Sequence, residues 1–206
     1  MSCQALQNRL PEEKTAKVLL AHFIDNISWT CRIVHGPTLR SDLHQLYETI
    51  HNGSLRVSVQ KLSLLSACLA VAIHFGKQIS IKPMTDEYAM KWRQNWTDLA
   101  EEALEESKHD ERPTIETLQA VIIMGYFLPS TAIQSRYTSL DTILKSARAI
   151  GLHQLDSKRN CQRRVYGSYD FIDIEIKRRV WWHIVYTDWM LSYMLVSLPR
   201  SQLSLT

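Results

Sequence analysis

The sequence contains few of the residues that interrupt regular structure. Glycine and proline occur only six times each in 206 residues. This content is too low for a collagen-like or linker chain, and it argues against an all-β domain with many tight turns. The most apolar window, Leu62–Phe75, contains serines and a histidine and is too short to span a bilayer. A membrane-spanning helix is therefore not expected.

Cysteine is also scarce, with single residues at Cys3, Cys31, Cys68 and Cys161. No two of them lie two to four positions apart, so the sequence does not indicate a zinc finger or a zinc ribbon. Such wide spacing is typical of reduced thiols in an intracellular protein. The N-terminal segment MSCQALQNRLPEEK has no apolar run after a basic start, so no signal peptide is indicated. We therefore expect a soluble intracellular protein.

Strong net charge and catalytic motifs are lacking as well. The formal net charge is +3, which is too small to indicate a nucleic-acid surface by itself. The sequence contains no G-x-S-x-G, no glycine-rich phosphate loop and no H-E-x-x-H. We therefore expect no catalytic residue, no cofactor and no bound metal in this chain. An enzyme with an unrecognised helical site is an alternative, and it would need a compact pocket with convergent titratable groups.

What the sequence does contain is apolar residues at helical spacing along nearly its whole length. The pattern predicts helices over about residues 12–27, 41–51, 57–75, 85–108, 112–129, 140–152 and 173–198. The period breaks at His35–Leu39, and Asp156–Asp170 is so charged and polar that we interpret it as an exposed loop. No alternating strand pattern competes with this one. We therefore predict an all-α fold, an irregular multi-helix array without repeats.

The helices differ in how much of their surface is apolar. Residues 57–75 are apolar on most of the circumference, which predicts a buried central helix. The next helix, opened by Pro83 and Thr85, is expected to expose aromatic residues in its first half, at Tyr88, Trp92 and Trp96. Its second half is acidic. Stop signals follow other segments, namely Asn-Gly-Ser after residue 51, Pro129 and Gly151.

Three groups of polar residues could carry chemistry, and each has a simpler interpretation that we prefer. His44 and His51 share a helical face, but no carboxylate is placed in sequence to complete an acid–base or metal site. The acidic run Glu101–Glu106 fits a solvated helix face better than a cation site. Cys161 lies among arginines that could make its thiol reactive, although most such cysteines have no chemical role.

The densest group of basic residues lies in SKRNCQRR, at Lys158, Arg159, Arg163 and Arg164. A basic patch of this kind can bind phosphate or act as a nuclear-import signal. Aromatic residues that would stack on bases are not interleaved with it. We prefer a solvated segment over a nucleic-acid site.

The last helix contains the unusual stretch EIKRRVWWHIVYTDWMLS, residues 175–192. On a helix its apolar side chains cover more than half the circumference, which predicts burial on several sides, with Trp182 in the core. So apolar a helix is expected to need partners beyond residue 206. We interpret the stretch as a core helix without catalytic residues.

The few charges of this stretch are expected to be paired. Glu175 lies three and four residues before Arg178 and Arg179, an orientation that favours ion pairs within a helix. Arg178 could stack on Trp182 one turn later. Asp188 must find a donor or remain at the surface.

Five segments taken together resemble the middle homology region of fungal zinc-cluster transcription factors. SARAIGLHQLD (residues 146–156) followed by EIKRRVWWHIVYTDWMLS is similar to the family's GLH and R-R-x-W-W elements. HGPTL, TIETLQAVIIMGYFL and SLPRS resemble three further elements, with Leu39 in place of the usual phenylalanine and Ser197 in place of glycine. The resemblance covers nearly the whole chain.

The resemblance implies an all-helical regulatory domain, residues 1–206, cut short at its C-terminus, in a transcription factor of the nucleus. DNA would be bound by a module in which six cysteines hold two zinc ions, and this module is not present here. Protein co-regulators, a homodimer partner or a small effector are the implied partners, and a membrane is not. A partner-sequestering interaction module without DNA binding is the alternative.

The resemblance and the helical spacing together single out one set of structural positions. Gly151, Leu152 and His153 belong to the GLH element. As a hypothesis, residues of the last helix form a polar and aromatic brace that fixes this helix against the array. The brace residues are Glu175, Arg178, Arg179, Trp181, Trp182 and Asp188.

Overall fold

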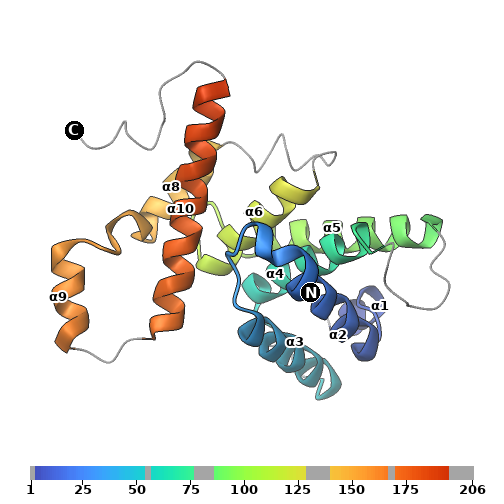
Figure 1. Cartoon of the computed structure of the whole chain (residues 1–206). Helices are drawn as coiled ribbons and strands as arrows, with labels where there is room; N and C mark the ends of the chain where they lie inside the picture. Colours follow the sequence, from blue (N-terminus) through green and yellow to red (C-terminus); the bar gives the residue numbers. More distant parts are fainter. Residues whose placement is uncertain (1–2, 54–56, 77–85, 129–139, 167–169, 195–206) are drawn as a thin grey trace.

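The computed structural model describes residues 3–53, 57–76, 86–128, 140–166 and 170–194. Within these ranges every regular element is a helix, which confirms the all-α prediction (Figure 1). The α-helices are α1 (Cys3–Arg9), α2 (Glu13–His22), α3 (Gly36–His51), α4 (Val59–His74), α5 (Asp86–Glu106), α6 (Ile115–Phe127), α8 (Leu140–Ala149), α9 (Lys158–Tyr166) and α10 (Phe171–Met194). Short turns of π- or 3₁₀-helix are η1 (Phe23–Ile27), η2 (Ser28–Thr30) and η3 (Leu152–Gln154).

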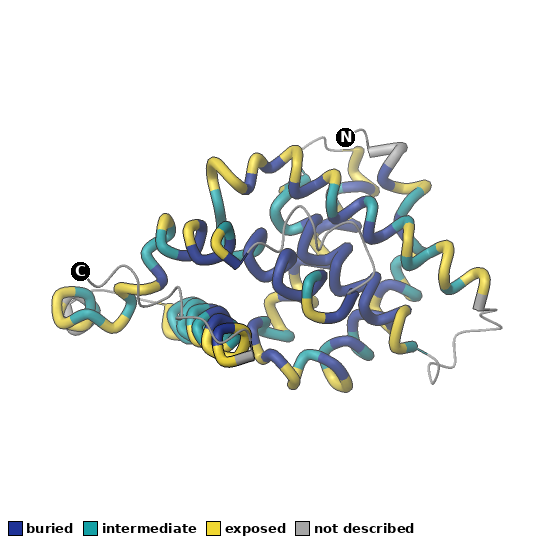
Figure 2. Tube along the Cα trace, turned by 90° about the horizontal axis from the view of Figure 1, so that it is seen from above, coloured by how far each residue is buried: buried dark blue, intermediate teal, exposed yellow. Residues whose placement is uncertain are grey.

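Helix α4 forms the centre of the array, as the sequence predicts. All residues from Leu62 to Ile73 are buried, because α5, α6 and α2 pack around this helix. Its start is capped by Ser58, whose hydroxyl accepts a hydrogen bond from the Lys61 backbone N–H. Figure 2 shows the buried residues gathered in the middle of the array.

Helix α5 corrects one prediction about exposed aromatic residues. Tyr88 is exposed and Trp92 is half-buried, but Trp96 is only 1% exposed. The Trp96 indole N–H donates to the backbone carbonyl of Arg9 at 3.0 Å. Trp96 shares its helical face with Leu99 and other buried residues of the acidic half, so it belongs to the core stripe of α5.

Helix α3 starts at Gly36, five residues before the expected start at Ser41. Pro37 occupies the first turn, where a backbone N–H would have no hydrogen-bond partner within the helix, so proline costs nothing there. Gly36 also allows close approach, since a Cβ there would lie 2.9 Å from a methyl group of Ile24. The expected stop is confirmed, because Gly53 has a left-handed backbone with φ of 62°.

Residues 156–170 contradict the loop prediction, since Lys158–Tyr166 forms helix α9. The segment contains neither glycine nor proline between Ser157 and Tyr166, and lysine, arginine and glutamine are good helix formers. Ser157 accepts a hydrogen bond from the Asn160 backbone N–H at the helix start. Polar composition alone therefore gave the wrong prediction here.

Helices α6, α8 and α10 pack together at one end of the array. Thr114 starts α6 with a reciprocal capping box to Thr117, which confirms the expected start signal. Gly151 ends the α8 segment with φ of 77°, again as expected. Helix α10 starts at Phe171, two residues before the expected position. The expected signals at Pro83, Thr85 and Pro129, the predicted end at Leu198 and the SLPRS element all lie outside the described residues.

Candidate functional site at the α6, α8 and α10 junction

The GLH element makes the turn that leads from α8 towards α10. Gly151 adopts the left-handed backbone that side chains disfavour, and η3 follows it directly. Leu152 is buried in the core, whereas His153 is exposed. The His153 ring lies 6.1 Å from the Trp181 ring, measured between centroids. His153 and Trp181 thus lie close together although they are 28 positions apart in the sequence.

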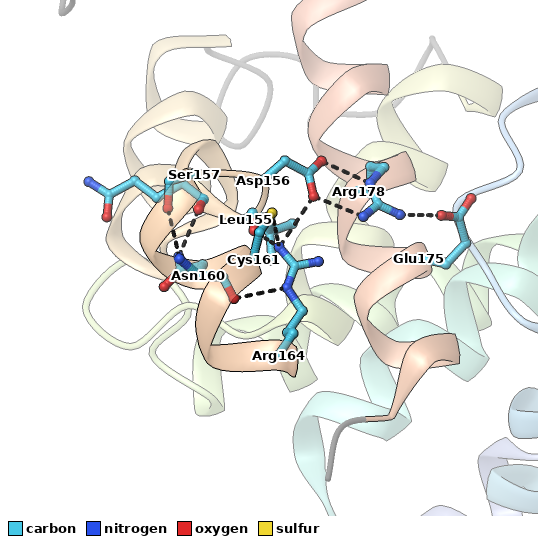
Figure 3. Close-up of polar contacts among 9 residues, drawn as sticks. Leu155, Asp156, Ser157, Asn160, Cys161, Arg164, Glu175 and Arg178 are labelled. Atoms are coloured by element: carbon cyan, nitrogen blue, oxygen red, sulfur yellow. Dashed lines mark hydrogen bonds and ion pairs between the residues drawn. The ribbon is translucent and has the colours of Figure 1, made fainter. Parts of the chain in front are cut away.

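Arg178 joins α10 to the segment before α9 through a two-pronged ion pair. Its Nε and Nη2 donate to the two carboxylate oxygens of Asp156 at 2.9 and 2.8 Å (Figure 3). Its Nη1 donates to Glu175 at 2.6 Å. The Arg179 Nε donates to the other Glu175 oxygen at 2.9 Å, so the expected pairs within the helix are confirmed. Because bidentate pairs fix orientation as well as distance, Arg178 sets how α10 lies against η3.

Asp156 is the residue that sequence reasoning did not select. It also accepts from Arg164 of α9 at 3.3 Å, and the same guanidinium donates to the Leu155 backbone carbonyl (Figure 3). Asp156 therefore connects η3, α9 and α10. A usable signal was present in the sequence, since Asp156 is the last residue of the GLHQLD segment.

The surrounding arginines shift the acidity of both carboxyl groups. The hydrogen bond from Arg178, with support from Arg164, lowers the pKa of Asp156 below its ordinary value of 3.8. The hydrogen bonds from Arg179 and Arg178 lower the pKa of Glu175 below 4.5. The two carboxylates in turn raise the pKa of Arg178. All three groups are therefore charged at neutral pH.

We predict that acid weakens the ion pairs of Arg178 with Asp156 and Glu175 before it weakens the hydrophobic core. Both carboxyl pKa values are lower in the folded chain than in the unfolded one, so the folded chain binds fewer protons. The stabilisation is complete above the unfolded pKa values and is lost as pH falls from about 5 through the folded values. Urea unfolding of the wild type and of Asp156→Asn, measured at a series of pH values, checks this. The stability difference between the two should shrink in acid, and a constant difference would contradict the ion-pair role.

The tryptophans of α10 correct the burial prediction. Trp182 is 59% exposed and Trp189 is 50% exposed, while Trp181 is half-buried. Only a narrow face meets the array, with Val180, Ile184 and Asp188 almost fully buried. The prediction was wrong because an apolar surface all round a helix shows what the helix can bury, not what is packed on it.

A cavity of about 450 Å³ lies between α6, α8 and α10. Most of its wall is aliphatic, and the polar groups come from one histidine, one tyrosine and one threonine. Of the described residues, the wall is formed by Val121, Ile122, Gly125, Tyr126, Leu140, Ile143, His183, Ile184, Thr187 and Leu191. Charged side chains do not occur among these ten. A volume of this size is typical of sites for small organic molecules.

His183 contributes an imidazole ring to the cavity wall. Burial lowers its pKa below 6.5, so the imidazole is neutral at neutral pH. Its ring meets the Tyr126 ring edge-on, at 5.9 Å between centroids. The Thr187 hydroxyl donates to the His183 backbone carbonyl at 2.9 Å. The cavity therefore presents carbon surface and neutral hydrogen-bonding groups, which suit an uncharged, largely apolar ligand.

The other candidate groups stay dispersed on the surface. Lys158 and Arg159 are exposed on α9, and Arg164 is partly buried against Asp156, so Arg164 does not point freely into solvent. The side chain of Arg163 lies outside the described residues. Cys161 is exposed, with its Sγ 3.7 Å from Arg164. The basic segment is thus a polar helix, which Arg164 fixes to Leu155 and Asp156, and Asp156 in turn pairs with Arg178 of α10.

The histidine and acidic groups form ordinary surface pairs. His44 lies 3.4 Å from Glu48 and 3.8 Å from Glu13. The expectation that no carboxylate is placed near His44 was wrong, because Glu48 follows it by one helical turn and Glu13 approaches from α2. Glu102 pairs with Arg9. Within the part of the chain that the structure describes, no three histidine, cysteine, aspartate or glutamate residues gather as a metal site. The zinc cluster implied by the resemblance does not fit these residues, because its six cysteines exceed the four present.

Over the described residues the chain is an all-α array in which the ion pair of Arg178 with Asp156 joins the GLH turn to the R-R-x-W-W helix. The family model for the fungal specific transcription factor domain matches residues 21–205. The chain belongs to this family.

Several curated relatives are transcription factors by name. The chain is 35% identical to the agnestins biosynthesis cluster transcription factor AgnL11 of Paecilomyces divaricatus, over 90% of this chain and 27% of that protein. It is 29% identical to the probable transcription factor lepB of Aspergillus flavus, over 89% of this chain and 33% of that protein. It is 26% identical to the activator of stress genes 1 of Saccharomyces cerevisiae, over 82% of this chain and 17% of that protein.

The chain spans a third or less of the length of these relatives. No solved structure matches it. Among the described helices, none combines the length and the apolar character that crossing a bilayer requires.

Proposed function

We propose that this chain is the regulatory domain of a fungal transcription factor, and that the cavity between α6, α8 and α10 receives a small effector. The cavity is the observation that carries the proposal, because it is large, mostly apolar and lined by residues of three helices. In this proposal the factor acts in the nucleus. Zinc and sequence-specific DNA contacts belong to a separate module of the whole factor.

The effector would act by selecting one spacing between α10 and its neighbours. Residues of all three helices line the cavity, so a ligand there contacts α10 on one side and α6 or α8 on the other. A ligand shifts a conformational equilibrium only by its difference in affinity for the two states. Because Arg178 connects α10 to Asp156, a shift of α10 would be transmitted to η3 and α9. Chemical catalysis has no part in this mechanism.

Filling the cavity is predicted to weaken ligand binding without weakening the fold. Gly125 lies on α6 in the cavity wall, and leucine is a better helix former by up to about 1 kcal/mol. In Gly125→Leu the added side chain would occupy space that a ligand needs. The uncharged apolar dye Nile red, titrated by fluorescence, should bind the wild type and bind this variant at least about tenfold more weakly. Ala149→Leu, at an exposed position of α8, is the matched control and should bind like the wild type.

A reporter assay tests whether the cavity controls transcription. The chain is fused to a zinc-cluster DNA-binding module and expressed in a fungal strain with a matching reporter. Reporter output of the wild-type fusion should vary with growth medium, while Gly125→Leu gives one constant output. Equal variation in the wild type, Gly125→Leu and Ala149→Leu would contradict the proposal, even if the dye binds.

A protein interaction module is the second candidate function, and the exposed aromatic face of α10 favours it. Trp182, Tyr186, Trp189 and Tyr193 are each at least half exposed. A group of this kind often marks a protein contact. An interaction module without an effector would leave reporter output independent of growth medium and of the cavity.

A further inference from the structure

One stripe of residues runs along the side of α10 that faces away from the array. The outer stripe consists of Glu175, Arg179, Trp182, Tyr186, Trp189 and Tyr193. Successive members are four or three residues apart, which is the spacing of a seam between two paired helices. Figure 2 looks down α10 and shows that the buried residues of this helix lie towards the array.

The aromatic part of this stripe is unusually open to solvent. The exposed fraction is 59% for Trp182, 62% for Tyr186, 50% for Trp189 and 84% for Tyr193. Single exposed aromatic residues are common, but four in register on one helix face form a contiguous apolar patch. A partner helix with the same spacing would bury all four.

We propose that the outer stripe is a homodimer interface, in which two copies of α10 pair antiparallel about an axis near Trp182. This inference goes beyond the proposed function and does not depend on the cavity. The charges of the stripe lie at its N-terminal end and the aromatics follow. Antiparallel pairing places Arg179 of one copy opposite Tyr186 of the other, and Glu175 opposite Trp189.

These pairings are chemically complementary. An arginine stacks favourably on a tyrosine ring, and an indole N–H donates to a carboxylate. Trp182 would meet Trp182 of the second copy at the axis, where both rings are desolvated together. Parallel pairing would instead bring Glu175 against Glu175 and Arg179 against Arg179, which like charges oppose. The stripe therefore fits a second copy of itself in one direction only.

The available area sets the expected strength of the dimer. Aromatic side chains bury about 150–250 Å² each when fully covered. Since these four are half exposed or more, the stripe offers roughly 400–600 Å² per copy, at the low end of specific interfaces. We therefore expect a reversible dimer with a Kd on the order of micromolar.

Sedimentation equilibrium of the whole chain, from about 1 to 200 µM, measures this dimer. The wild type should change from monomer to dimer across this range. Trp182→Lys should raise the Kd at least about 100-fold, because two lysines would meet at the axis. Val18→Lys, at an exposed apolar position of α2, is the matched control and should dimerise like the wild type. Circular dichroism confirms that each variant is folded.

Cysteine cross-linking tests the direction and the register in which the two copies of α10 pair. The background is Cys3→Ser with Cys161→Ser, which leaves the two buried thiols, Cys31 and Cys68. Trp182→Cys should form a disulfide-linked dimer under mild oxidation. Tyr193→Cys should not, because antiparallel pairing separates its two copies by about 30 Å at 1.5 Å per residue.

Three results would overturn the proposal. The first is a wild-type monomer at every concentration, which would mean that the stripe is covered by something other than a second copy. The second is a dimer that Trp182→Lys leaves intact, which would place the interface elsewhere. The third is cross-linking of both cysteine variants, which would indicate parallel pairing. None of these results bears on dye binding in the cavity, so the two proposals fail independently.

Discussion

Trp96→Ala should lower the free energy of unfolding by about 3–5 kcal/mol, the usual cost of removing a buried indole. The ring is 1% exposed and fills the space between α5 and the end of α1, so truncation leaves a cavity that the surrounding helices cannot fully close. Its loss also removes a hydrogen bond to the Arg9 carbonyl. Urea unfolding followed by circular dichroism measures the change as a lower midpoint with an unchanged slope.

Two variants separate the packing of Trp96 from its hydrogen bond. Trp96→Phe keeps most of the volume, and the Arg9 carbonyl retains a second donor, the Asn95 side-chain amide at 2.8 Å. We therefore expect a loss of only about 1–2 kcal/mol. Tyr88→Ala, on the exposed part of the same helix, should cost less than about 1 kcal/mol. A similar small loss for Trp96→Ala would contradict its place in the core.

Helix positions were predictable where local signals agree with burial. The central helix α4 is apolar on nearly all sides, and no other role fits such a segment. Thr114 before α6 and the left-handed Gly53 and Gly151 mark helix ends. These signals can be read from the sequence because a cap depends only on residues within a few positions of the helix end. Trp96 was mispredicted because the burial of a side chain depends on neighbours that are distant in the sequence. The error at α9 was of another kind, since polar composition was taken to mean a loop although its residues are good helix formers.

The candidate site was only partly predictable for the same reason. The pairs of Glu175 with Arg178 and Arg179 follow from helical spacing alone. The contact of Arg178 with Asp156 spans 22 positions and depends on the turn at Gly151, so spacing could not reveal it. The cavity depends on how three separate helices meet, and no motif in the sequence encodes its wall.

Ile184→Ala is expected to cost about 2–4 kcal/mol, whereas Trp182→Ala should cost less than about 1 kcal/mol. The smaller side chain has the larger effect because Ile184 is 1% exposed on the inner face of α10, while Trp182 is 59% exposed on the outer stripe. Removing Ile184 takes away contacts with α6 and α8, and it enlarges the adjoining cavity. Thermal and urea unfolding of both variants provide the comparison.

This comparison requires dilute protein, well below the micromolar range, because dimerisation adds apparent stability as concentration rises. Under these conditions the wild type and Trp182→Ala should unfold at nearly the same urea concentration, with Ile184→Ala clearly lower. At high concentration, the wild type and Ile184→Ala should both gain stability, whereas Trp182→Ala should not, since it alone lacks the aromatic residue of the outer stripe at the dimer axis. A large loss for Trp182→Ala in dilute solution would instead mean that the indole is packed within a single chain. That result would restore the buried core helix that the sequence suggests.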